Sequence, residues 1–92
     1  MAITGFKHKG LEELFTKGHS AKVGSRYHKN ALGILDHIHY TVELEELQGV
    51  KDFHVLKGVR KETYSMHVSG NYCITFKWDG ENAYDVQFED YH

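Results

Sequence analysis

The sequence predicts an α+β fold, with a curved, mainly antiparallel sheet and the N-terminal helices packed on one of its faces. Two observations support this prediction. Apolar residues recur at helical intervals as far as residue 47, and from residue 64 they alternate with polar residues. Two segments rich in turn residues, 69–71 and 79–82, divide the alternating half into three stretches. Helices followed by a meander of strands are typical of an α+β domain, and we expect residues 1–92 to form a single one.

The first half is expected to contain a short strand and then helices. Residues 3–7 predict the strand, and residues 10–17 predict a short helix that Gly18 is placed to end. The longest amphipathic helix is expected over residues 25–39, because its apolar side chains recur every three or four positions.

A further short helix is expected around Leu44 and Leu47. Thr41 is placed to cap it, with Glu43 near its positive end and Gly49 after it.

The second half is expected to form strands at residues 53–56, 64–68, 72–78 and 83–88. In the last two strands, the alternation predicts these side chains on the face that meets the helices: Tyr72, Ile74, Phe76, Trp78, Tyr84, Val86 and Phe88. The other face is expected to stay partly free, so chemistry could take place there.

The composition excludes several classes of protein. Cys73 is the only cysteine, which excludes an internal disulfide and a cysteine-rich zinc site and fits a reducing compartment. No segment has the length and apolar character of a signal peptide or a membrane span. The eight histidines show no zinc-site spacing. We therefore expect a cytoplasmic protein with no metal, no cofactor and no membrane partner.

The net charge is only −2, but it is unevenly distributed. Residues 1–35 carry +4, residues 36–50 carry −4, residues 51–61 carry +3 and the remainder carries −5. A protein that binds nucleic acid without a partner usually has a large net positive charge, because phosphate contacts supply most of the affinity. If this chain acts on nucleic acid, we expect it to rely on local basic patches or on a larger assembly that presents the substrate.

Reactive groups gather at the carboxyl end of the chain. The last expected strand runs into Glu89, Asp90, Tyr91 and His92, and a carboxylate, a phenol and an imidazole held by a strand can move protons. His54, which lies in the first strand of the second half, offers another imidazole.

Several segments, taken in order, resemble one family: Phe6-Lys7-His8-Lys9-Gly10-Leu11, Leu44-Glu45-Glu46-Leu47, Leu56-Lys57-Gly58, Tyr72-Cys73-Ile74-Thr75-Phe76 and Glu89-Asp90-Tyr91-His92. The chain resembles the HigB-type toxins of the RelE/ParE superfamily, also described as plasmid maintenance killer proteins. This resemblance spans the whole chain. Its most specific element is the combination of Leu56-Lys57-Gly58 with the Asp-Tyr-His end.

The resemblance implies a RelE-like fold and a ribosome-dependent endoribonuclease that cleaves mRNA in the decoding site. It also implies an antitoxin partner, HigA-like and with a helix-turn-helix domain. That antitoxin would hold the toxin inactive and would mediate any contact with operator DNA.

The resemblance further implies these site residues: His54, Lys57, Asp90, Tyr91 and His92 as catalytic groups, with Arg60 and Lys61 as additional RNA phosphate contacts. Asp90 and His92 would transfer protons or orient the substrate, Tyr91 would position a nucleotide, and Lys57 would meet the scissile phosphate. The roles of acid and base are open between His54 and His92.

One position departs from the family pattern. Family members usually carry an arginine where this chain has Cys73, and a thiol cannot replace the guanidinium fork that an arginine offers to a phosphate. Loss of one transition-state donor costs on the order of 10² to 10³ in rate. We therefore expect either a weakened natural nuclease or a variant selected because the active toxin stops its host growing. Val59, where an acid is frequent, and the uncharged Ser69 also depart from the pattern.

Two other interpretations remain open. The chain could be a non-catalytic protein of this fold that acts by binding its antitoxin, which Cys73 favours, or a gyrase-poisoning relative, which the reactive carboxyl end opposes. Cys73 lacks the companion residues of a thiol nucleophile and is interpreted as a strand-face thiol.

Overall fold

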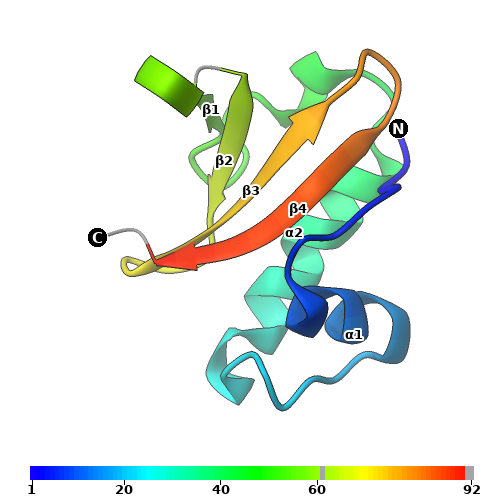
Figure 1. The fold of residues 1–92 in the computed structure, drawn as a ribbon, viewed down its shortest axis with the longest axis vertical. Helices are drawn as coiled ribbons and strands as arrows, with labels where there is room; N and C mark the ends of the chain where they lie inside the picture. The colour runs from blue at the N-terminus through cyan, green and yellow to red at the C-terminus, as the bar shows by residue number, and fades with distance from the viewer. Residues whose placement is uncertain (61, 91–92) are drawn as a thin grey trace.

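The computed structural model describes residues 1–60 and 62–90 (Figure 1). The elements follow one another as α1 (Lys9–Lys17), η1 (Ser25–Tyr27), α2 (His28–Tyr40), η2 (Leu44–Leu47), β1 (His54–Val55), η3 (Gly58–Arg60), β2 (Thr63–His67), β3 (Tyr72–Trp78) and β4 (Ala83–Asp90). The strands lie in the order β1-β2-β3-β4, and each is antiparallel to the next. The predicted α+β fold with an antiparallel sheet is confirmed. Three of the predicted site residues, Lys61, Tyr91 and His92, lie outside the described residues.

The sheet and α2 share one hydrophobic core, and α2 lies behind β3 and β4 in Figure 1. Ile34, Leu35 and Ile38 of α2 are fully buried, as are Ile74 and Phe76 of β3. Burial of a side chain of this size contributes about 1.5–3 kcal/mol relative to exposure. Packing therefore fixes which face of the sheet the helices cover.

The helices largely follow the predicted boundaries. Gly18 ends α1 with a φ of +78°, and its N–H donates to the carbonyl of Leu14 at 2.8 Å. The long helix predicted over residues 25–39 begins as the short 3₁₀ turn η1 and continues as α2. No helix within the described residues is both long enough and apolar enough to cross a membrane.

The predicted cap of the short helix η2 was wrong. Thr41 instead closes α2, where its N–H donates to the carbonyl of His37 at 3.1 Å. Glu43 caps η2: its side chain accepts from the N–H of Glu46, and its own N–H donates to Glu46 Oε2 at 2.8 Å. This reciprocal pair satisfies two backbone donors, whereas a single hydroxyl satisfies one.

A bulge in β4 changes the predicted alternation. The register shifts by one residue between Thr75 and Lys77 of β3, and Asp85 of β4 has a φ of +52° in this stretch. Val86 is fully buried as expected. Tyr84, which was expected to face the helices, instead pairs with Lys77 on the opposite face. That prediction was wrong because one extra residue inverts the side-chain order on one side of the bulge.

The predicted N-terminal strand forms only isolated parallel bridges with β4, between Ile3 and Ala83 and between Phe6 and Val86. The bulge interrupts the regular spacing that a continuous ladder requires. The N–H of Lys7 nevertheless donates to the carbonyl of Val86 at 2.8 Å. This contact fixes the start of the chain along the outer edge of β4.

Candidate functional site

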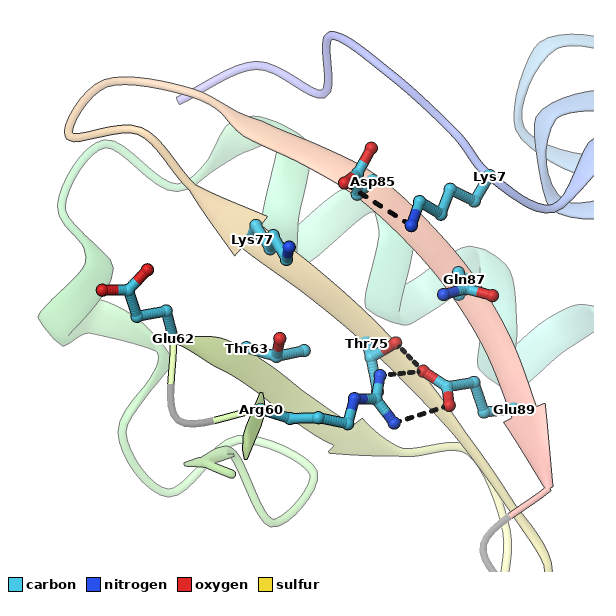
Figure 2. A pocket seen from close by; sticks show the side chains of 9 residues that line it. All are labelled: Lys7, Arg60, Glu62, Thr63, Thr75, Lys77, Asp85, Gln87 and Glu89. Carbon is cyan, nitrogen blue, oxygen red and sulfur yellow. Dashed lines mark hydrogen bonds and ion pairs between the residues drawn. The ribbon is translucent and has the colours of Figure 1, made fainter. Parts of the chain in front are cut away.

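A hollow of about 420 Å³ lies on the helix-free face of the sheet (Figure 2). It is lined by the N-terminal segment, by η3 and the residue before β2, and by β2, β3 and β4: Lys7, Arg60, Glu62, Thr63, Thr75, Lys77, Asp85, Gln87 and Glu89. Among the described residues of this lining, basic and acidic side chains are equal in number, so their charges balance. Thr75 and Lys77 line the hollow, in agreement with the prediction of a partly free face.

A two-bonded ion pair in the hollow joins Arg60 to Glu89. Arg60 Nη1 donates to Glu89 Oε1 at 2.8 Å, and Nη2 donates to Oε2 at 2.6 Å. The hydroxyl of Thr75, from β3, donates to the same Oε2 (Figure 2). The hydrogen bonds from Arg60 hold the pKa of Glu89 below its ordinary value and raise the pKa of Arg60. Both groups are therefore charged at neutral pH.

Cys73 lies beside this ion pair. It stands opposite Glu89 in the β3–β4 register and is 6% exposed. Burial raises the pKa of the thiol, and a hydrogen bond with Ser65 opposes that effect more weakly. A protonated, buried thiol is a poor nucleophile, which agrees with its interpretation as a strand-face residue. Arg60 acts electrostatically on Cys73, so a guanidinium lies near the position where the family pattern has an arginine.

The ring of His54 is oriented by the turn that precedes β1. Its Nδ1 lies 2.7 Å from the carbonyl oxygen of Asp52, and its edge meets the ring of His67 at a centroid distance of 5.9 Å. The Asp52 carboxylate in turn lies 3.5 Å from His67 Nε2. Lys51 and Asp52 have φ values of 50° and 57°, a region that residues other than glycine rarely adopt. The chain thus holds an uncommon turn that places Asp52 between two imidazoles.

This contact fixes the tautomer of His54. A carbonyl oxygen only accepts hydrogen bonds, so Nδ1 of His54 must carry the proton. In the neutral ring, Nε2 then holds the lone pair and can accept a proton.

Other histidines stabilise local structure. His8 Nδ1 caps α1 by accepting from the N–H of Leu11 at 3.1 Å. His39 Nδ1 accepts from the N–H of Ile3 at 3.2 Å and so ties the start of the chain to α2. Within residues 1–60 and 62–90, no three histidine, cysteine or acidic side chains are grouped as they would be around a metal ion.

Residues 4–92 match the family described as the RelE-like toxin of the type II toxin-antitoxin system HigB. The chain is also 37% identical over 91 residues to Endoribonuclease HigB of Proteus vulgaris, and the match covers 98% of this chain and 99% of that protein. The chain belongs to the HigB-like toxin family. Membership of this family implies an antitoxin partner.

In this HigB-like chain, the predicted site residues are divided between two regions. His54 shares the helix-free face with the hollow, because it pairs with Ser65 and Ser65 pairs with Thr75. Lys57 is exposed between β1 and η3, and Asp90 is exposed at the end of β4. Since β1 and β4 are the two outer strands, β2 and β3 lie between His54 and Asp90, with each strand spacing about 4.8 Å.

Sequence reasoning gave no role to three residues that shape this face. Glu89 and Thr75 complete the contacts of Arg60, and Asp52 orients His54. Glu89 was visible only as part of the reactive carboxyl end. Its contact with Arg60 joins η3 to β4 across 29 residues of sequence, and the local pattern of neither segment indicates it.

Proposed function

We propose that this HigB-like toxin is an endoribonuclease that cleaves mRNA in the decoding site of the ribosome. The observation that carries the proposal is the 37% identity, over 98% of the chain, to a protein named Endoribonuclease HigB. The helix-free face supports it with an oriented imidazole, His54, and a guanidinium, Arg60, on the same side of the sheet.

The proposed reaction uses the 2′-hydroxyl of the RNA itself. His54 Nε2 accepts the proton of that hydroxyl, and the oxygen attacks the adjacent phosphorus to form a 2′,3′-cyclic phosphate. The bond from phosphorus to the 5′-oxygen breaks, and His92 or Asp90 supplies the proton that the leaving oxygen takes up. The Nδ1 contact of His54 with the Asp52 carbonyl supports the assignment of base to this ring.

Cationic side chains would stabilise the charge that develops on the phosphate oxygens. Lys57, Arg60 and Lys61 have this role in the proposal, and Tyr91 positions a neighbouring nucleotide. Cys73 supplies no charge, so we propose that the chain is slower than a homologue with arginine at this position.

The charge distribution supports dependence on the ribosome. The net charge is −2, and the part of the hollow's lining that the structure describes holds as many acidic as basic side chains. Such a surface attracts free RNA weakly, because affinity for nucleic acid rises with the number of phosphates neutralised. A ribosome that holds the mRNA in place would supply the positioning that this surface lacks. We further propose that the antitoxin has a helix-turn-helix domain and that operator DNA is reached only through it.

The proposal is tested by incubating the purified chain with mRNA bound to ribosomes and, separately, with free mRNA. We expect cleavage only in the ribosome-bound sample, with products that end in a cyclic phosphate. His54→Gln should lower the rate by about 10² or more, since general acid–base catalysis contributes on that scale. His37→Gln is the matched control, because His37 is exposed on α2.

Equal loss of activity in His54→Gln and His37→Gln would contradict the role of His54. Cleavage of free mRNA at the same rate would contradict ribosome dependence. If the chain cuts neither sample but still binds its antitoxin, the non-catalytic interpretation replaces the nuclease.

A further inference from the structure

We propose that Arg60 is the principal phosphate-binding residue of this chain and that Glu89 occupies its binding groups until RNA displaces it. This inference rests on the proposed function, since it names how the RNA is held. It follows from the contacts around Glu89, from the charges in the hollow and from the exposure of the pair.

The contacts of Glu89 are those that a phosphate would make. Two parallel N–H···O bonds from Arg60, at 2.8 and 2.6 Å, use the fork that guanidinium groups offer equally to carboxylates and to phosphates. The hydroxyl of Thr75 is a third donor directed at the same group. Thr75 is 2% exposed on a central strand, so its position is fixed by the sheet. The carboxylate of Glu89 therefore stands where two non-bridging oxygens of a phosphodiester could be received.

The other basic residues of the hollow are less well suited. Lys7 lies 3.9 Å from Asp85, and an ammonium offers no planar fork. Lys77 makes no ion pair among the described residues, and it lies apart from the contacts that join Arg60, Thr75 and Glu89 (Figure 2). Among the described basic residues of the hollow, only Arg60 combines paired donors with a neighbouring hydroxyl and a place beside Cys73.

Glu89 also cancels the charge that would attract RNA. While it remains in place, the acidic and basic side chains among the described residues of the hollow balance. When it leaves, the donors around Arg60 carry an uncompensated positive charge. Lys7 acts electrostatically on Glu89 and offers it an alternative partner once it turns away.

The pair is accessible enough to exchange partners. The side chain of Arg60 is 43% exposed and that of Glu89 is 24% exposed. Exposed ion pairs add little to stability, because water and salt screen them. A phosphate can therefore compete with Glu89 for Arg60 without disrupting the core.

The test measures binding of the full chain to a fluorescein-labelled single-stranded RNA of about ten nucleotides, without ribosomes, at several salt concentrations. Glu89→Gln keeps the size of the side chain and an acceptor for Thr75 but removes the charge. We expect it to bind RNA about tenfold more tightly. Arg60→Gln should bind about tenfold more weakly, and its slope of log affinity against log salt should fall by about 0.7, the value for one phosphate contact on a single strand.

Asp85→Asn is the matched control, because it removes a negative charge from the same hollow without touching Arg60. We expect it to change RNA affinity by less than about twofold, as for a screened charge at the surface. The double variant Arg60→Gln with Glu89→Gln should show no gain over Arg60→Gln alone. Arg60→Lys keeps the charge but not the fork, and should recover only part of the lost affinity. Circular dichroism verifies that each variant is folded.

Three outcomes would overturn the inference: unchanged binding in Glu89→Gln, an equal gain in Asp85→Asn, or a gain from Glu89→Gln that persists without Arg60. Ribosome-dependent cleavage, measured in parallel, separates this inference from the proposed function. A tighter Glu89→Gln variant without cleavage by any form would leave the phosphate site standing and would remove the nuclease. Ribosome-dependent cleavage without tighter RNA binding by Glu89→Gln would support the nuclease and contradict the phosphate site.

Discussion

The two faces of the sheet bury side chains of different polarity. On the face covered by α2, Met66, Ile74 and Phe76 are fully buried and apolar. On the helix-free face, Ser65 and Thr75 are buried to nearly the same degree, with exposures of 0% and 2%, yet each carries a hydroxyl. Neighbouring positions on one strand thus serve different purposes, because successive side chains point to opposite faces. This difference implies that substitutions at neighbouring positions of one strand can alter stability and chemistry separately.

The largest expected effect comes from the covered face. Phe76→Ala should lower the free energy of unfolding by about 3–5 kcal/mol, because it removes a fully buried ring and leaves a cavity. Urea denaturation of the purified chain measures this. Lys77→Ala, the next residue on the same strand, is the control and should change stability by less than about 0.5 kcal/mol. Similar losses in both variants would show that the two faces do not divide stability as proposed.

The next effect concerns chemistry on the helix-free face. Cys73→Arg should raise the rate of ribosome-dependent cleavage by on the order of 10² to 10³, because it adds a donor fork opposite Glu89 and beside Arg60. Single-turnover cleavage of ribosome-bound mRNA measures the change.

Cys73→Ser is the control for this experiment, since it removes the thiol without adding charge, and its rate should match that of the unaltered chain. A Cys73→Arg variant that folds but cleaves no faster would mean that Arg60 already supplies the donors expected from an arginine at position 73.

The sequence predicted the covered face better than the free one. Alternation alone identified Ile74 and Phe76 as core, because every second residue of a strand shares a face. Tyr84 was misplaced because the bulge at Asp85 arises where the N-terminal segment and β3 meet β4, and local alternation carries no information about that meeting.

The same limit applied to the candidate site. His54 and Arg60 were identifiable by residue type and by family resemblance. Their partners depend on tertiary geometry. Glu89 reaches Arg60 only because η3 and β4 line the same hollow, and the Asp52 carbonyl reaches His54 only through an uncommon turn. Contacts between distant segments follow from strand register, which the periodicity of one strand does not specify.

The smallest expected effect distinguishes a structural ion pair from one that yields to a ligand. Because the pKa of Glu89 is lowered in the folded chain, its contribution to stability is present above the ordinary glutamate value of about 4.5 and is lost as the pH falls from there through the lowered pKa. Glu89→Gln should therefore be less stable by about 0.5–1 kcal/mol at pH 7, after screening of the exposed pair, and the difference from the unaltered chain should be smaller at pH 3. Urea denaturation at the two pH values measures the difference, with Asp85→Asn as the control.

A purely structural role for the pair predicts that Glu89→Gln loses stability and RNA binding together. The competition proposed for Arg60 predicts opposite signs, with lower stability at neutral pH and tighter RNA binding in the same variant. Since stability and binding are measured on one protein sample, a parallel loss of both would contradict the competition directly. Opposite signs would show that Glu89 adds a small amount of stability to the helix-free face while it competes with phosphate for Arg60.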